Sequence, residues 1–212
     1  VLDVNLGVSV NEGASVGITV TDLSASDVDT ADAALVYTIT SAPANGQVRI
    51  GGVAVTSFTQ EDLVNGLVEY VHDGSDTVSD AFTFELSDGT TTLASSSFDI
   101  VVNAVDDAPQ LDTNTGVTVA EEGVVAITTA ELSASDPDTA DADIIYTVSG
   151  LTNGQIEVGG TATSSFTQED LVNGLVQYRH DGSETTSDAF TFTVTDGTTT
   201  LASDTFSITV TP

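Results

Sequence analysis

Acidic residues spaced two apart are the feature of this sequence that most clearly points to chemistry. One pair is Asp27 with Asp29, and the other is Asp136 with Asp138. Neighbouring carboxylates supply hard oxygen ligands, which suit Ca²⁺ because it takes about six to eight of them, whereas Mg²⁺ keeps waters in a tighter octahedron. Transition metals prefer imidazole or thiolate, and the chain has no Cys and only 2 His. The Asp pairs therefore predict bound Ca²⁺.

Further acids lie in Gly- and Ser-containing segments of the kind that form turns. They are Glu12, Asp73, Asp80, Asp88, Asp106 and Asp107, followed by Glu121, Glu122, Asp181, Asp188 and Asp196. The chain carries 33 Asp and Glu against 2 Lys and Arg, a formal net charge of −31. Two carboxylates about 5 Å apart repel by about 3 kcal/mol at an effective dielectric constant near 20. Such acids either point apart into water or hold a cation among them.

Solvation by water and an EF-hand are two alternatives to this kind of calcium site. Solvation accounts for the isolated acids Glu61, Glu69, Glu85 and Asp99, since scattered surface charge keeps a protein soluble. An EF-hand is excluded, because its loop needs Asp at positions 1, 3 and 5 with Gly at 6, and residues 136–141 lack that pattern. The single His of each half, His72 or His180, is expected to pack or hydrogen-bond at a turn.

Composition excludes several classes of partner and site. Nucleic acid and anionic membrane need a basic face, which a chain with 2 Lys and Arg lacks. A hydrophobic content of 40% is too high for a disordered acidic tail. The absence of Cys excludes disulfides and thiolate chemistry. No apolar run reaches the length of a membrane span, about 18 residues, and any secretion signal is expected outside this sequence.

The chain is one unit written twice. Residues 45–98 and 153–206 align without gaps over 54 positions, of which 39 are identical. The period of about 109 residues is that of a domain and exceeds the 20–50 residues or so of solenoid repeats. All twelve aromatic residues occupy equivalent positions in the two copies, which predicts that they pack the cores.

Short runs that alternate between apolar and polar residues predict β-strands. In the first copy they are Val8–Val10, Val16–Val20, Leu35–Ile39, Val48–Ile50, Val53–Val55, Leu67–Val71, Ala81–Leu86 and Ser97–Val102. Thr59 as an N-cap, with Asp62 three residues later, predicts one or two helical turns that end at Asn65-Gly66. This pattern predicts an all-β fold of immunoglobulin-like β-sandwiches.

No enzyme is predicted. The sequence shows no Gly-x-Ser-x-Gly elbow or other nucleophile context. A pair of catalytic carboxylates would need one of them in an apolar pocket, whereas these acids lie in polar turns.

Several motifs resemble cadherin repeats. They are Asn11-Glu12-Gly13, Ser26-Asp27-Val28-Asp29 with Leu35-Val36-Tyr37, Ser87-Asp88-Gly89, and Asn103-Ala104-Val105-Asp106-Asp107-Ala108-Pro109. More specifically, Phe58-Thr59-Gln60-Glu61-Asp62-Leu63 and Tyr70-Val71-His72-Asp73-Gly74-Ser75 resemble the chondroitin-sulfate-proteoglycan type of cadherin-like repeat, which also fills long bacterial surface adhesins, some with RTX secretion signals. The resemblance implies two tandem cadherin/immunoglobulin-like Greek-key β-sandwiches, each with a short inserted helical turn. Residues 1–105 and 106–212 would form the repeats, with a linker at about 103–109.

The resemblance also implies Ca²⁺ between consecutive repeats. The ligands at the internal junction would be Glu12, Asp73, Asn103, Asp106, Asp107, Asp136, Asp138 and Asp196. Those facing an upstream repeat would be Asp27, Asp29 and Asp88, and those facing a downstream repeat would be Asp181 with Glu121 or Glu122. Asn103 and Val105 stand where cadherins usually have Asp and Asn, which implies fewer ions. An alternative is a site within one unit formed by Asp73, Asp80 and the Asp pair, with Asp181 and Asp188 as the equivalents of the first two in the second unit.

The function implied is a calcium-stiffened extender of a long bacterial adhesin on the cell surface, which mediates adhesion or biofilm formation and projects a distal ligand-binding domain. The expected partners are neighbouring repeats of the same chain, with a host or biofilm surface reached through other domains, and the chain is expected to be a monomer. The rival hypothesis is a module that binds a glycan or protein directly. An animal proteoglycan ectodomain is disfavoured, because Lys and Cys are absent and the acidity suits a salt-adapted microbe.

Overall fold

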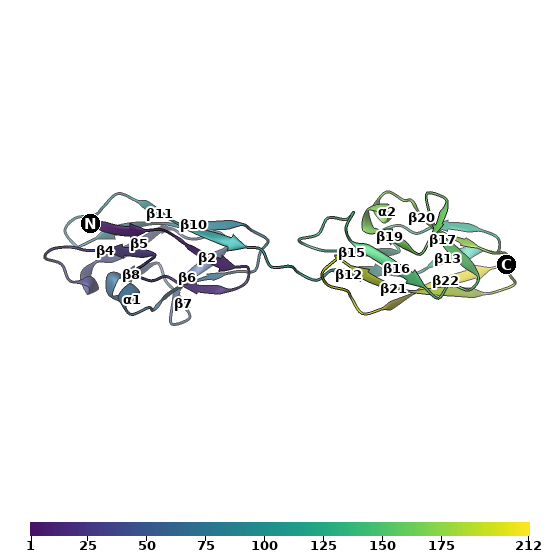
Figure 1. Ribbon diagram of the computed structural model, residues 1–212, viewed down its shortest axis with the longest axis horizontal. Helices are drawn as coiled ribbons and strands as arrows, with labels where there is room; N and C mark the ends of the chain where they lie inside the picture. The colour runs from purple at the N-terminus through teal and green to yellow at the C-terminus, as the bar shows by residue number, and fades with distance from the viewer. The chain divides into compact units, whose positions relative to one another are not determined.

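The chain forms two compact units, Val1–Val105 and Asp106–Pro212, in a computed structural model that describes residues 1–212. Each unit consists of a five-stranded and a four-stranded β-sheet, a two-stranded pair and a short helix (Figure 1). This architecture confirms the predicted fold class, two tandem β-sandwiches that each carry an inserted helical turn. No helix is long and apolar enough to cross a membrane.

Unit 1 has a five-stranded sheet ordered β2-β11-β10-β5-β8, a four-stranded sheet ordered β3-β9-β6-β7, and the pair β1-β4. Its elements are β1 Leu2–Asn5, β2 Val8–Asn11, β3 Ser15–Gly17, β4 Leu23–Ala25, a 3₁₀ turn at Asp32–Ala34, β5 Val36–Ser41, β6 Gly46–Ile50, β7 Val53–Ala54, β8 Ser57–Thr59, α1 Gln60–Val64, β9 Val68–His72, β10 Ser79–Ser87 and β11 Ser96–Asn103.

Unit 2 repeats the arrangement, with sheets ordered β13-β22-β21-β16-β19 and β14-β20-β17-β18 and the pair β12-β15. Its elements are β12 Gln110–Asn114, β13 Val117–Ala120, β14 Val124–Ala126, β15 Leu132–Ser135, β16 Ile145–Ser149, β17 Gly154–Val158, β18 Thr161–Thr163, β19 Ser165–Thr167, α2 Gln168–Val172, β20 Val176–His180, β21 Ser187–Thr195 and β22 Asp204–Thr211. In both units the second strand pairs with the last strand in parallel, while the other strand pairs are antiparallel.

Alternating burial along the strands gives each unit its own hydrophobic core. All twelve aromatic side chains are buried, as the duplication predicted. In unit 1 the ring centroids of Tyr37 and Phe58 lie 5.0 Å apart, and those of Phe82 and Phe98 lie 5.1 Å apart, both pairs stacked. The equivalent pairs of unit 2 both lie at 4.9 Å. Rings this large supply much of the apolar surface that each sandwich buries.

The helix of each unit begins as the sequence predicts. Thr59 and Asp62 form a complete capping box, and the helix ends at the cap residue Asn65. The sequence did not reveal that Gln60 is buried, or that its Oε1 accepts from the Ala25 N–H at 2.9 Å and from the Tyr37 hydroxyl at 2.8 Å. Gln168 makes the same two bonds in unit 2. This amide therefore fastens the helix to the pair β1-β4 and to the five-stranded sheet.

The predicted strands differ from the observed ones mainly where strands are short. The run Val16–Val20 was predicted as one strand, but β3 ends at Gly17. Strands β1, β4 and β8 were not predicted. Strands β4 and β8 have three residues each, too few for a period of two to be visible in the sequence.

A carboxylate inside each unit holds the loop before β6. Asp80 accepts hydrogen bonds from the N–H groups of Ala44 and Asn45, both at 2.9 Å, and from the Tyr70 hydroxyl at 2.8 Å. Burial alone would raise the pKa of Asp80, but these donors outweigh it and hold the pKa below its ordinary value. Asp188 has the same partners in unit 2.

Gly46 is required where this loop meets Tyr70. A Cβ at this position would lie 2.5 Å from both the Tyr70 hydroxyl oxygen and the Val71 carbonyl oxygen. Because a backbone oxygen cannot move away as a side chain can, we expect Gly46→Ala to lower the free energy of unfolding by about 3 kcal/mol. Gly17→Ala is the control, since nothing lies within 4 Å of its Cβ position. Thermal melts that showed equal losses for the two variants would contradict this prediction.

The only ion pair lies on the four-stranded sheet of unit 2. The Arg179 Nε is 2.8 Å from the Glu157 Oε1, and the amides of Gln155 and Gln177 donate to the same carboxylate at 2.7 and 2.6 Å. The hydrogen bond from Arg179, followed by those from the two amides, lowers the pKa of Glu157 to about 2. In unit 1 the equivalent positions are Arg49 and Val71, so the pair is absent there.

This pair predicts a pH dependence of stability. A carboxylate whose pKa is lower in the folded state stabilises the fold above its ordinary pKa, and this contribution disappears as the pH falls toward the folded value. The melting temperature of the wild type should therefore exceed that of Glu157→Gln at pH 6, with the gap closing between about pH 4.5 and pH 2. Glu169→Gln, an exposed acid of the same unit, should show no such gap. A gap for Glu157→Gln that stayed constant with pH would contradict the assignment.

Candidate metal centre

Two acidic loops at one end of unit 2 fold around their own carboxylates. The Asp136 Oδ1 accepts from the N–H groups of Asp138 and Thr139 at 2.9 and 2.8 Å. The Asp196 Oδ1 accepts from the N–H groups of Thr198 and Thr199, both at 2.6 Å. These are turns in which an Asp side chain takes the place of a backbone acceptor. One oxygen of each carboxylate is thus used by its own loop.

The second oxygen of each of these carboxylates has no partner. The Oδ2 atoms of Asp136 and Asp196 are buried and accept no hydrogen bond. A buried charged acceptor without a partner carries a desolvation cost that a bound cation would remove. Carboxylate oxygens that accept no hydrogen bond are available as ligands for Ca²⁺.

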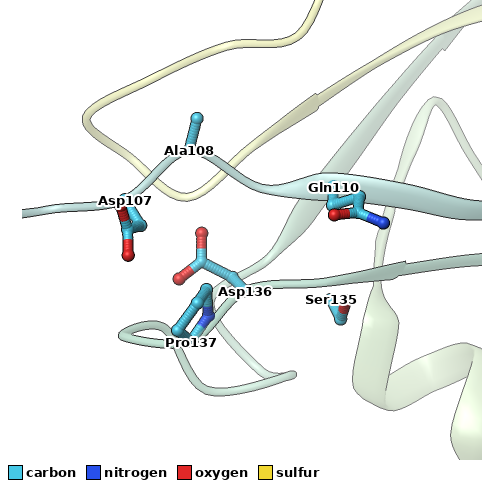
Figure 2. A pocket seen from close by; sticks show the side chains of 6 residues that line it. All are labelled: Asp107, Ala108, Gln110, Ser135, Asp136 and Pro137. Carbon is cyan, nitrogen blue, oxygen red and sulfur yellow. The ribbon is translucent and has the colours of Figure 1, made fainter. Parts of the chain in front are cut away.

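A cavity of 440 Å³ lies against the loop that carries Asp136. Asp107, Ala108, Gln110, Ser135, Asp136 and Pro137 line it. Figure 2 shows the carboxylates of Asp107 and Asp136 projecting into this space from two facing segments of unit 2. The Asp107 N–H also donates to the Asp138 Oδ2 at 2.8 Å. This bond ties the linker to the Asp pair through Asp107, and both Asp106 and Asp107 are exposed.

The equivalent loops of unit 1 have the same form. The Asp27 Oδ1 accepts from the N–H groups of Asp29 and Thr30 at 3.2 and 3.1 Å, and Asp88 accepts from Thr90 and Thr91. Asp27 and Asp88 both line a second cavity, of 210 Å³. The Thr91 N–H and the donors of Thr90 lower the pKa of Asp88 to about 2. This carboxylate therefore stays ionised at neutral pH and is ready to bind a cation.

The Asp pair of unit 1 carries the repulsion that the sequence suggested. The hydrogen bond with Asp27 and then its charge raise the pKa of Asp29, while hydrogen bonds from Asp29 lower the pKa of Asp27. Two carboxylates that titrate against each other in this way favour a shared counter-ion.

A different group of residues lies at the other end of unit 1. The Glu12 Oε2 accepts from the Val105 N–H at 3.4 Å, and its Oε1 is buried without a partner. The Asp73 Oδ1 accepts from the N–H and the hydroxyl of Ser75 at 3.0 and 2.6 Å. The Asn103 amide donates to the side chains of Ser9 and Asn11, so its Nδ2 is committed and only its oxygens could serve a cation.

His72 joins the two turns that carry Glu12 and Asp73. Its Nδ1 accepts from the N–H groups of Gly13 and Gly74, both at 3.2 Å, and its Nε2 bonds the Thr77 hydroxyl at 2.9 Å. Because Nδ1 accepts, Nε2 carries the proton, and neither nitrogen is free to bind a metal. His180 has the same partners in unit 2, with the N–H of Glu122 in place of that of Gly13. Both imidazoles act at turns, as expected.

The contacts of His180 also place the acids Glu121 and Glu122. Glu122 donates to His180 as Gly13 does to His72, whereas the Glu121 N–H donates to the Thr211 carbonyl as that of Glu12 does to Asn103. The counterpart of Glu12 in the backbone is therefore Glu121, and a ligand role for Glu121 or Glu122 stays a prediction. Asp181 accepts from the Ser183 N–H at 2.9 Å, as Asp73 does from Ser75.

The structure does not bring Asp80 and Asp188 into these groups. Their oxygens accept from backbone N–H groups and from a Tyr hydroxyl inside each unit. Their role as ligands stays a prediction, and these bonds give them a structural role that needs no ion.

Glu122 is the one non-glycine residue with a positive φ, at 59°. Gly13 has a φ of 65° at the equivalent position. Because a side chain in the left-handed region is strained, we expect Glu122→Gly to raise the stability of unit 2 by about 1 kcal/mol. Glu121→Gly is the control. It should lower the stability of unit 2, because the strained backbone belongs to Glu122 and not to Glu121. Equal melting temperatures for wild type and Glu122→Gly would refute the assignment of strain.

Both units are similar in sequence to known proteins. A family model described as cadherin-like matches residues 1–102 and again 109–210. The mouse extracellular matrix organizing protein FRAS1 is 41% identical over 204 residues, which are 92% of this chain and 5% of that protein. Human FRAS1-related extracellular matrix protein 2 is 37% identical over 92% of this chain and 6% of its own length, and human chondroitin sulfate proteoglycan 4 is 33% identical over 68% and 6%. The chain thus spans a small fraction of these relatives.

Solved structures agree on the fold. The first two repeats of human mucin-like protocadherin superpose with a TM-score of 0.61 at 16% identity, covering 100% of this chain and 98% of that one. Repeats 21–23 of human CDH23 give a TM-score of 0.58 at 19% identity, covering 99% of this chain and 68% of that one. At such low identity these matches concern the arrangement of strands alone.

Proposed function

The chain belongs to the cadherin-like family, and from that premise we propose that its units are calcium-stiffened extender repeats of a long extracellular adhesion protein. The family match covers both units, and the relatives are extracellular matrix and proteoglycan proteins. Cadherin-like and immunoglobulin-like domains are structural modules, so the proposed role is mechanical spacing and not catalysis. The proposed partners are neighbouring repeats of the same chain and, through other domains, a surface.

The buried, unpartnered oxygens of Asp136 and Asp196 carry the calcium part of this proposal. Asp107, Asp138 and the cavity beside them add further oxygens from the same unit. Bound Ca²⁺ would tie the linker at Asp107 to the loops of unit 2, and so restrict the bending of the chain where it enters that unit. Ca²⁺ suits this donor set because all of its side chains offer oxygen and none offers nitrogen or sulfur.

The setting of the protein is a second part of the proposal. We propose that the chain belongs to a bacterial surface adhesin, exported by an RTX-type system and active in adhesion or biofilm formation. The extreme acidity and the lack of Lys and Cys support this setting. The relatives reported above are animal proteins, so they support an extracellular role in adhesion or matrix and give no support to a bacterial one.

The alternative function, direct binding of a glycan or protein ligand, has less support. All twelve aromatic side chains lie in the cores, which leaves no exposed ring on which a sugar could stack. A specific hit on a glycan array would revive this alternative.

Calcium binding predicts a rise in thermal stability. A ligand that binds only the folded state at 100 times its dissociation constant stabilises it by about 2.7 kcal/mol, which for a domain of this size raises the melting temperature by about 10 °C or more. We therefore expect millimolar Ca²⁺ to raise the melting temperature of the wild type well above its value in chelator.

The double variant Asp136→Asn with Asp196→Asn should lose this shift. Asn keeps an oxygen for the loop N–H groups but replaces the free oxygen with an amide donor, so the loops can still fold. Glu169→Gln is the matched control and should keep the full shift. An identical melt of the wild type in chelator and in Ca²⁺ would end the calcium proposal, and an undiminished shift in the double variant would move the site elsewhere.

A further inference from the structure

We propose that unit 1 binds an extended peptide segment at the side of its sandwich where β7 and β8 are the edge strands of the two sheets. The bound segment adds its backbone to the edge at Ser57 and places one aliphatic side chain in the cavity beside that edge. This inference goes beyond the proposed spacer function and gives the alternative of direct binding a defined site. The site takes an aliphatic group, so the burial of all aromatic rings does not argue against it.

A cavity of 200 Å³ lies beside the two edge strands of unit 1. Strand β7 ends the four-stranded sheet and β8 ends the five-stranded sheet, and Val55 and Thr56 connect the two strands. Both of these connecting residues line the cavity. Its apolar wall is formed by Ile39, Ala42, Pro43, Val48, Ala54 and Val55.

Unit 2 carries a leucine at the position equivalent to Pro43. This residue, Leu151, packs against the core of unit 2. Val148 of unit 2 is buried, whereas its counterpart Ile39 stays half-buried and lines the cavity of unit 1. The comparison indicates that a leucine-sized aliphatic group is what this space accommodates.

A longer loop accounts for the open cavity in unit 1. The segment that leads to Asn45 is one residue longer than the segment that leads to Asn153. The register between β5 and β10 shifts between Ile39 and Ser41, while the equivalent ladder between β16 and β21 is regular. Such a bulge bends the strand that carries it. The loop after β5 therefore leaves the sheet in a different direction from its counterpart in unit 2.

The backbone groups of Ser57 point away from the neighbouring strand. The Ile39 N–H donates to the Thr56 carbonyl at 2.9 Å, so the carbonyl of Thr56 faces β5. Successive residues of a strand direct their N–H and C=O groups to opposite sides, as the antiparallel pattern requires. The N–H and C=O of the exposed residue Ser57 therefore lie on the free edge of the five-stranded sheet.

Unit 2 caps this edge with a hydroxyl that unit 1 lacks. The Thr163 hydroxyl donates to the Ser165 carbonyl at 2.8 Å and accepts from the Ser165 N–H at 3.1 Å. Val55 takes the place of Thr163 in unit 1, so the N–H and C=O of Ser57 do not have this partner. One donor and one acceptor on the same edge residue are what an added strand bonds to.

The charge of the chain decides which segments can bind. A formal net charge of −31 repels acidic segments and a second copy of the chain, and it attracts a segment that contains Lys or Arg. Side chains of an extended segment alternate between its two faces, so the residues on either side of the aliphatic one point away from the cavity. The segment that fits is therefore extended and basic, with Val, Leu or Ile between polar residues.

Amide hydrogen exchange of the whole chain tests the open edge. The Ser57 N–H should exchange severalfold faster than the Ser165 N–H, because only the second has a hydroxyl partner. Val55→Thr supplies the missing hydroxyl and should slow the exchange of Ser57. Val101→Thr is the control, since it makes the same change on β11, where unit 2 has Thr209, and it should leave Ser57 unchanged. Equal exchange of Ser57 and Ser165 in the wild type would overturn the open edge.

Selection of random peptides displayed on phage against the whole chain tests binding. The wild type should enrich sequences with an aliphatic residue, Lys or Arg, and no acid. Synthetic peptides of the enriched sequences should slow the exchange of the Ser57 N–H. They should bind the double variant Pro43→Leu with Val55→Thr, which carries the residues of unit 2, at least about tenfold more weakly. Their affinity for Val101→Thr should equal that for the wild type.

Several outcomes would refute the peptide site. They are the enrichment of no peptide, equal binding to the wild type and the double variant, and a dimer of the chain in sedimentation that the double variant abolishes. Val55→Thr alone replaces the double variant if Pro43→Leu does not fold, and it should also weaken binding. All measurements are made in chelator, so failure of the calcium proposal would leave their outcome unchanged.

Discussion

Mutual repulsion among carboxylates is the constraint to which the rest of this structure responds. With 33 acids and 2 permanent cations, the chain cannot neutralise itself with ion pairs, and it forms only the pair between Arg179 and Glu157. It solvates its acids with backbone N–H groups instead, as at Asp80, Asp88 and Asp196. Such dipoles stabilise a carboxylate without a counter-charge, but they use only some of its oxygens. Buried carboxylate oxygens without a hydrogen bond remain at Glu12, Asp136 and Asp196.

Buried polar anchors complement this treatment of the acids. Gln60 and His72 each tie together segments that are distant in the sequence, and each does so through one atom that accepts two hydrogen bonds. Their counterparts Gln168 and His180 repeat these bonds. The two copies keep these bonds although they differ at many other positions.

The sequence predicts features that depend on neighbouring residues better than those that depend on distant ones. The helix with its capping box at Thr59 and Asp62 was correct, since its signal lies within four residues. The backbone donors to Asp80 could not be predicted, because Ala44 and Asn45 lie 36 and 35 residues away in the sequence. Glu121 and Glu122 could not be told apart, because the sequence does not show which residue adopts a left-handed backbone. The three-residue strands β4 and β8 were missed, since their place is set by pairing across the sheet.

Each sandwich closes with its own ends. In both copies the first strand of the five-stranded sheet pairs with the last strand of the unit. Each unit also has a separate core. A duplicated segment of the gene therefore adds a complete domain whose sheets need no strand from a neighbouring unit. The number of copies can grow or shrink by whole units without disturbing the folding of the others, so the reach of the protein is free to vary during evolution.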